Sequence, residues 1–237
     1  MIYHPRLGEI HAVLLDVDGT LYRQGELKIR LLAQFFLSFL HHPFSSFRDT
    51  KILYHFRKDR EALRKIPESG VDLEKKQYEV TAQRLGISHD LVRTTVKKWI
   101  FELPLPYIKK SKYKGVDEFI RKCKHAELKV GVYSDYPSRS KIEAMGLTKW
   151  IDLYLCSTDP KINAFKPSTR GLELAVKSWG EKAENVLYVG DRLDVDAESA
   201  AKLSMPFVLI GKAGKFSNHT QVLWVRNYHE LLELLNL

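Results

Sequence analysis

Cysteine and long apolar runs are both scarce in this sequence. Only Cys123 and Cys156 are cysteines among the 237 residues. Two thiols are too few for the disulfide framework of a small secreted domain, so we expect a cytoplasmic protein in a reducing compartment. No apolar run approaches the roughly 20 residues that a membrane-spanning helix needs. The N-terminal segment also lacks the apolar stretch and cleavage site of a signal peptide, so no membrane partner is expected.

Acidic residues are few relative to basic ones. The chain has 38 Lys and Arg but 29 Asp and Glu, which gives a net charge of +9. An excess of this size is typical of proteins that bind nucleic acid, a membrane surface or an anionic substrate. No helix-turn-helix, zinc-finger or RNA-binding signature accompanies the charge, which argues against nucleic acid as the partner.

Short apolar runs rich in Val, Leu and Tyr are abundant near the N-terminus and in the second half of the chain. Helical patterns separate most of these runs. Alternating strands and helices predict an α/β fold with a Rossmann-like parallel sheet and helices on both faces. Ligands of such sheets bind beyond the C-terminal ends of the strands. The predicted strands are 11–18, 129–134, 152–157, 185–190, 206–211 and 222–225, and the predicted helices are 116–126, 138–146, 169–180 and 196–204.

Residues 21–112 show helical patterns and no clear strand. Ser88 is a candidate N-cap, and Pro67 and Pro104 are candidate helix stops. An aromatic stripe in and just after the first of these helices predicts packing inside the helical part or between it and the rest of the chain, and lining of a substrate pocket is the alternative. The predicted helices are 28–42, 47–66, 72–86 and 88–103, and the stripe is Phe35, Phe36, Phe39, Phe44 and Phe47.

The excess positive charge belongs entirely to the helical segment. Residues 21–112 hold 19 Lys and Arg against 10 Asp and Glu, whereas residues 1–20 and 113–237 together hold 19 of each. The change of pattern and the charge divide the chain at the same places, so we predict two domains, a neutral core formed by 1–20 and 113–237 and a smaller all-helical domain formed by 21–112. The charge could attract an anionic substrate, or it could simply belong to solvated helix faces.

Two carboxylates follow the first predicted strand. Asp16 and Asp18 lie one residue apart, before Gly19 and Thr20. Such a pair is unfavourable unless a cation binds it, and Mg²⁺ prefers hard oxygen ligands of this kind. A carboxylate can attack phosphorus, and a second carboxyl can donate a proton and later deprotonate water. An ordinary turn is the alternative, because Asp and Gly are common turn residues.

Further polar residues follow two later strands or precede helices. Taken singly, each has an ordinary interpretation as a strand-end hydroxyl, a surface lysine or a helix cap. Their shared placement at strand ends predicts one common site. These residues are Ser134, Asp135, Lys166, Asp191, Asp194 and Asp196.

Four segments in order resemble the four motifs of the haloacid dehalogenase (HAD) superfamily. They are DVDGTL at 16–21, VYSD at 132–135, FKP at 165–167 and GDRLDVD at 190–196. The resemblance implies a Rossmann-like HAD core with a helical cap domain inserted between the first two motifs. It also implies a phosphatase, a phosphoric monoester hydrolase that uses Mg²⁺ and an aspartyl-phosphate intermediate to act on a small phosphorylated metabolite.

The resemblance assigns the catalytic roles residue by residue. Asp16 would be the nucleophile and Asp18 the general acid and base. Ser134 and Lys166 would complete the catalytic set, and both would bind the phosphoryl group together with Asp135. Dehalogenases of the superfamily lack an acid at the place of Asp18, so its presence argues against dehalogenation.

The resemblance also implies a metal site. Mg²⁺ would be held by the Asp16 carboxylate, the Asp18 backbone carbonyl and Asp191. Asp196 or Asp194 would orient metal-bound water from outside the ligand set. Two alternatives to a phosphatase stay open, a phosphotransferase of the phosphoglucomutase kind and a basic binding module with weak catalysis. No motif names the substrate, the cap residues that contact it or the oligomeric state.

Overall fold

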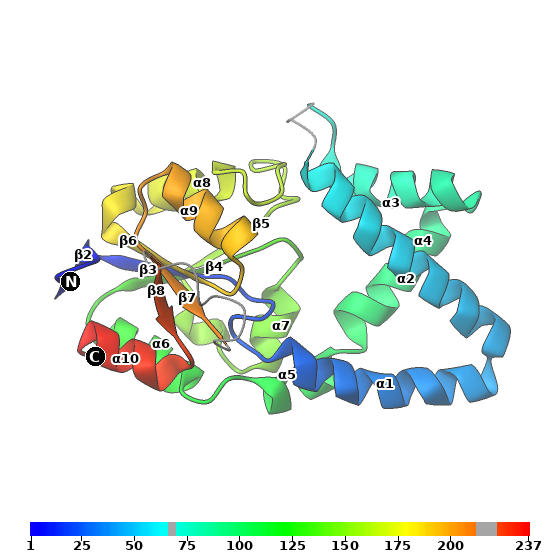
Figure 1. Ribbon diagram of the computed structural model, residues 1–237, viewed down its shortest axis with the longest axis horizontal. Coiled ribbons are helices and arrows are strands. Elements are labelled where there is room, and N and C mark those ends of the chain that lie inside the picture. The colour runs from blue at the N-terminus through cyan, green and yellow to red at the C-terminus, as the bar shows by residue number, and fades with distance from the viewer. Residues whose placement is uncertain (66–69, 212–221) are drawn as a thin grey trace.

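A computed structural model describes residues 1–65, 70–211 and 222–237, and within them one parallel sheet of six strands forms the centre of the molecule. The strand order is β5-β4-β3-β6-β7-β8 (Figure 1). A short antiparallel hairpin of β1 (Ile2–His4) and β2 (Gly8–Ile10), which we did not predict, precedes the sheet. The predicted α/β fold is confirmed. The sheet strands are β3 (Ala12–Leu15), β4 (Lys129–Ser134), β5 (Leu153–Cys156), β6 (Val186–Gly190), β7 (Phe207–Ile210) and β8 (Leu223–Val225).

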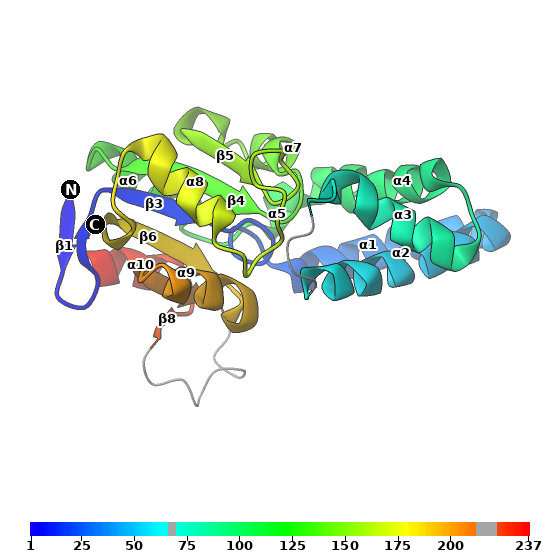
Figure 2. The same ribbon diagram turned by 90° about the horizontal axis from the view of Figure 1, so that it is seen from above.

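Helices cover both faces of the sheet (Figures 1 and 2). Alternate residues of β3 explain this arrangement, because successive side chains of a strand point to opposite faces. Val13 and Leu15 belong to an apolar cluster with α6 and α10, whereas Ala12 and Leu14 belong to a second cluster with α8. The helices of this part are α6 (Val116–His125), α7 (Arg139–Ala144), α8 (Arg170–Trp179), α9 (Glu198–Lys202) and α10 (Tyr228–Leu235).

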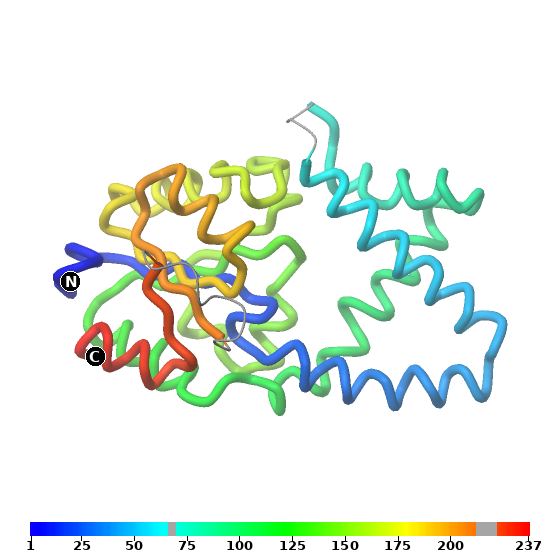
Figure 3. The backbone as a smooth tube through the Cα atoms, viewed as in Figure 1, coloured from blue at the N-terminus to red at the C-terminus, as the bar shows by residue number. Residues whose placement is uncertain are grey.

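The helical segment between β3 and β4 lies to one side of the sheet (Figure 3). It has its own buried apolar cluster, which includes Ile52, Phe56, Tyr78 and Val92. The sheet clusters and this third cluster are separate. Its helices are α1 (Gln24–His41), α2 (Pro43–Arg64), α3 (Leu73–Leu85), α4 (His89–Val96) and α5 (Leu105–Ser111), with a π-helical segment (Lys97–Glu102) after α4.

Local sequence signals set most helix ends in this segment. Ser88 caps α4 by accepting a hydrogen bond from the backbone N–H of Leu91, as predicted. The helix predicted over 88–103 ends before Pro104, as expected, since the π-helical segment stops at Glu102. We did not predict α5, which begins directly after Pro104. Pro106 lies in its first turn, where a proline loses no intrahelical hydrogen bond. The stop predicted at Pro67 lies outside the described residues.

The aromatic stripe of α1 and the start of α2 is not buried, contrary to prediction. Phe36, Phe44 and Phe47 are 62%, 92% and 70% exposed. Within the stripe only Phe35 packs against a neighbouring aromatic ring, that of Trp99, with the centroids 5.3 Å apart and the rings tilted by 57°. Helical periodicity identifies an apolar face but does not say whether another element covers it. In the described part of the chain, no helix is both long and apolar enough to cross a membrane.

Candidate active site

The C-terminal ends of three neighbouring strands bring the predicted residues together. β3 lies between β4 and β6, so Asp16 after β3, Ser134 at the end of β4 and Asp191 after β6 share one edge of the sheet. Carboxylate oxygens of Asp16, Asp191 and Asp196 lie within 4.8 Å of one another. The strand order also reverses at β3, which is where open parallel sheets form ligand crevices.

Lys166 links two of these carboxylates. Its Nζ lies 2.7 Å from Asp16 Oδ1 and 2.9 Å from Asp196 Oδ1, and its side chain is only 2% exposed. Burial alone would lower the pKa of Lys166, but the two carboxylates raise it well above its usual value. Thr20 Oγ1 donates to the other oxygen of Asp16 at 2.9 Å. Lys166 is therefore a charged ammonium group beside Asp16.

The site has more buried negative charge than Lys166 compensates. Burial, together with repulsion from neighbouring carboxylates, raises the pKa of Asp16 to about 7 and that of Asp191 to about 8. A cation bound between the two carboxylates would reverse this effect. The donor set of hard carboxylate oxygens is therefore one that Mg²⁺ would fit.

Gly19 leaves the space that this acidic cluster needs. Its φ of +108° lies in a region that side chains with a Cβ rarely adopt, and a Cβ there would lie 2.1 Å from Asp191 Oδ2. The backbone of the Asp16–Gly19 loop therefore passes directly against Asp191. The backbone carbonyl of Asp18 lies in this loop and accepts a hydrogen bond from Gln24 Nε2 at 2.5 Å.

The Asp18 carboxylate has donors of its own. Lys141 Nζ lies 2.6 Å and 2.8 Å from its two oxygens, and the Tyr22 hydroxyl donates to Oδ1. Ser134 Oγ lies 3.5 Å from Oδ2, at the limit of a hydrogen bond, and accepts from the backbone N–H of Tyr136 at 3.2 Å. Asp16 and Asp18 thus interact with different lysines.

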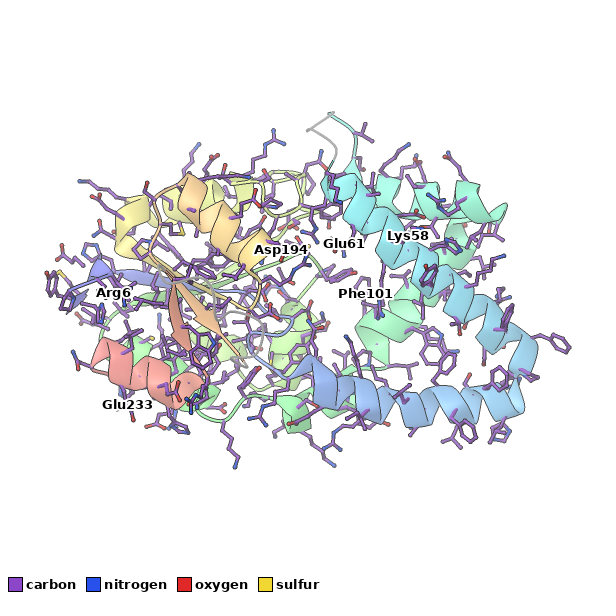
Figure 4. The ribbon with its side chains drawn as sticks, viewed as in Figure 1. Arg6, Lys58, Glu61, Phe101, Asp194 and Glu233 are labelled. Atoms are coloured by element: carbon purple, nitrogen blue, oxygen red, sulfur yellow. The ribbon has the colours of Figure 1, made fainter. Side chains whose placement is uncertain are left out.

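Two of the predicted side chains point elsewhere. The Asp135 carboxylate accepts hydrogen bonds from Arg64 at 2.7 Å and from Ser157 at 2.6 Å. Burial works against its charge, but the neighbouring arginines prevail and lower the pKa of Asp135 to about 2. Asp135 could therefore offer a phosphate only its backbone N–H. Asp194 is 71% exposed and pairs with Arg192 at the margin of the site (Figure 4), so Asp196 alone joins the cluster.

A cavity of about 340 Å³ opens above these residues, between the sheet and the helical segment. Its floor includes Asp16, Asp18 and Asp191, and its upper wall comes from α1, α2 and the π-helical segment. Among the described residues, the basic side chains of 21–112 that line it are Lys28, Arg57, Arg60 and Arg64, and its apolar lining there includes Leu27, Leu31, Trp99 and Ile100.

Comparison with known proteins then decides the family. Residues 10–203 match the sequence profile of the haloacid dehalogenase-like hydrolases. The chain belongs to this family. It is thus a HAD-superfamily hydrolase, as the motifs predicted. Comparison with curated protein sequences gave no match.

Solved structures share the fold of this HAD hydrolase at low sequence identity. A HAD phosphatase from Thermococcus onnurineus is 19% identical, with a TM-score of 0.61 over 95% of this chain and 98% of that one. A 2-haloacid dehalogenase from Pseudomonas syringae pv. Tomato DC3000 is 17% identical, with a TM-score of 0.63 over 96% and 98%. A beta-phosphoglucomutase from Clostridium difficile is 13% identical, with a TM-score of 0.62 over 96% and 97%.

Several residues around the site of this HAD hydrolase escaped sequence reasoning. Asp18 is contacted by Lys141 and Tyr22. Two arginines of α2, Arg60 and Arg64, donate hydrogen bonds to the loops after β4 and before α8. Tyr188 donates a hydrogen bond to Asp196 at 2.7 Å. Nothing in the sequence distinguishes these lysine and arginine residues from the other basic residues, 38 in all. Tyr188 lies in a strand whose apolar pattern already explained it.

Proposed function

We propose that this HAD hydrolase is a Mg²⁺-dependent phosphatase that acts on a small phosphoric monoester through an aspartyl-phosphate intermediate. The observation that carries the proposal is the second acid of the first motif. The Asp18 carboxylate lines the same cavity as Asp16, and dehalogenases of the superfamily lack an acid there. A general acid at this position is needed when a phosphoric ester is cleaved, because the alkoxide that leaves must be protonated.

The arrangement supplies a group for each step of phosphoryl transfer. Asp16 attacks phosphorus, and the bond to the ester oxygen breaks while Asp18 gives that oxygen its proton. Water then attacks the phosphorus of the aspartyl phosphate, Asp18 takes a proton from this water, and inorganic phosphate leaves. Lys166 and Ser134 compensate and hold the phosphoryl oxygens, so most of the catalysis is positioning and charge stabilisation.

Asp16, Asp191 and the Asp18 backbone carbonyl would hold the Mg²⁺, and Asp196 would lie just outside the ligand set. Members of the family generally use this ion, which supplies charge neutralisation for the phosphoryl oxygens. Asp196 meanwhile holds Lys166 and Tyr188 in place through its Oδ1. Its Oδ2 accepts the backbone N–H of Arg192 at 3.1 Å, which fixes the turn after Asp191.

The helical segment 21–112 would act as a cap that selects a cytoplasmic phosphorylated metabolite. Arg60 and Arg64 fasten α2 to the sheet through the Asp135 carbonyl and carboxylate. The other basic side chains of this segment that line the cavity, Lys28 and Arg57, are exposed and could face an anionic substrate. The apolar lining beside them would accept a small hydrocarbon part of the leaving group.

Replacement of the nucleophile tests this function. We expect Asp16→Asn to abolish release of phosphate from the best substrate of a phosphoester panel while the fold survives, since the amide is no nucleophile for phosphorus. Asp194→Asn, which removes an acid from the same segment of chain as Asp196 but points to solvent, should keep wild-type turnover. Retention of most activity by Asp16→Asn, measured as inorganic phosphate released, would show that the mechanism is wrong.

A phosphotransferase of the phosphoglucomutase kind is the second candidate. It is favoured by the similarity to the beta-phosphoglucomutase structure, which extends over 97% of that chain and 96% of this one. Product analysis separates the two functions. A phosphatase releases inorganic phosphate from the substrate, whereas a mutase returns an isomerised sugar phosphate and releases little.

A further inference from the structure

Lys141 is a buried lysine that the motif set does not include. It lies in α7, and its side chain is 3% exposed. Its Nζ contacts both oxygens of the Asp18 carboxylate, at 2.6 Å and 2.8 Å, and lies over the Tyr136 ring at 5.6 Å from the centroid. Burial of an ammonium group is costly unless it is paired. The pairing with Asp18 therefore accounts for the position of Lys141 in the fold.

The two lysines of the site are divided between the two acids of the first motif. Lys166 pairs with Asp16 and Asp196, whereas Lys141 pairs with Asp18. The terminal torsion of an aspartate is broad, so an isolated Asp18 carboxylate would sample many orientations. Lys141 and the Tyr22 hydroxyl approach it from separate elements and restrict that torsion. Ser134 at 3.5 Å adds little.

We propose that Lys141 is a positioning residue for the general acid Asp18. It holds the Asp18 carboxyl at the cavity, where the leaving-group oxygen would lie. Asp18 takes up a proton from solvent before the reaction and passes it to that oxygen. Lys141 keeps its own protons and compensates the charge then left on Asp18. This inference rests on the proposed phosphatase function. It adds a residue outside the four motifs to the machinery for leaving-group protonation.

The leaving group provides the decisive test. An alkyl phosphate such as glycerol 3-phosphate needs a proton on its leaving oxygen, whereas p-nitrophenyl phosphate releases a stable anion. The ratio kcat/KM reports the steps up to formation of the aspartyl phosphate. The later attack of water therefore does not affect the comparison of the two esters. We expect Lys141→Met to lower kcat/KM about 100-fold for the alkyl ester, within the range of general acid catalysis, and less than about threefold for the nitrophenyl ester.

A second lysine offers a matched control. Lys112 is 13% exposed, pairs with Asp117 at 2.6 Å and donates to the Met145 carbonyl at the end of the same helix α7. Lys112→Met therefore removes a partly buried lysine that supports α7 without touching Asp18, and it should leave the ratio of kcat/KM for the two esters unchanged. If Lys141→Met fails to fold, Lys141→Gln keeps a hydrogen-bond donor without the charge and should show the same selective loss.

A double-mutant cycle shows whether Lys141 acts through Asp18. In an Asp18→Asn background, Lys141→Met should change kcat/KM for the alkyl ester by less than about threefold, because the two changes remove one shared function. Equal losses for both esters, or a further loss of about tenfold in that background, would overturn the role of Lys141 and leave the phosphatase function intact. Absence of hydrolysis of both esters by the wild-type protein would refute the phosphatase function and this inference together.

Discussion

The sheet part and the helical part of this protein differ in charge and in how their side chains are used. Residues 1–20 and 113–237 carry equal numbers of acidic and basic residues, yet their acids gather at one edge of the sheet. Residues 21–112 carry the whole excess of +9, yet only some of their basic groups line the cavity. The comparison teaches that local placement, and not net charge, decides which charges can act on a ligand.

The helical part also shows two uses of arginine on one face of α2. Arg60 is buried, with its guanidinium 3.8 Å from the Tyr136 ring centroid and bonded to the Asp135 carbonyl. Arg57, one turn earlier, is exposed at the cavity. The first fastens the helix to the sheet, and the second can meet a substrate. Both contribute equally to the net charge of the segment.

A change in the sheet part should give the largest effect. We expect Gly19→Ala to lower kcat/KM about 100-fold or more, because its Cβ would displace Asp191 by more than the tolerance of a catalytic site. Gly146→Ala is the matched control, since Gly146 also has a positive φ, +74°, but a Cβ there would meet no atom within 4 Å. Similar losses of activity in the two variants would mean that backbone strain, and not the space beside Asp191, explains the result.

The acidic edge of the sheet predicts a dependence of stability on pH and Mg²⁺. The raised pKa values of Asp16 and Asp191 mean that the folded protein holds protons that the unfolded chain releases. Their stabilising effect is present below about pH 4 and is lost as the pH rises through about 7 to 8. In a chelator, the melting temperature should therefore fall from about pH 5 to about pH 8.

Addition of Mg²⁺ should offset this fall, because the ion binds the deprotonated carboxylates. The rise in melting temperature on adding the ion should be several degrees larger at about pH 8 than at about pH 6. For a protein of this size, each kcal/mol of added stability raises the melting temperature by roughly 2–4 °C. Differential scanning fluorimetry with and without the ion measures this difference in melting temperature, and Asp191→Asn should remove the difference. An equal rise at both pH values would mean that the ion does not bind at these acids.

A change in the helical part should give the smallest effect. Arg57 lines the cavity, whereas its neighbour Lys58 does not. We expect Arg57→Gln to raise KM for a phosphorylated substrate about twofold to fivefold, as for loss of an exposed ion pair, and Lys58→Gln to leave KM unchanged. Steady-state kinetics at low and high salt measures both. Equal increases in KM for the two variants would mean that the net charge of the cap, and not the placement of its charged residues, attracts the substrate.

Much of the fold and the place of the site could be predicted from the sequence. A parallel sheet aligns the carboxyl ends of its strands, so polar residues that follow apolar runs must gather at one edge. This rule alone places Asp16, Ser134 and Asp191 together. The choice between Asp194 and Asp196 could not be made in this way, because both lie in one short turn.

The sequence by itself determined the strand and helix alternation, the four motifs and the uneven distribution of charge. Those properties depend on composition and on contacts within a few residues. Only the tertiary structure decided that Lys141 pairs with Asp18, that Arg57 faces the cavity, and that the Phe44 side chain stays in solvent. Each of these depends on which surface of a helix a distant element covers, and helical periodicity is the same whether that surface is covered or free.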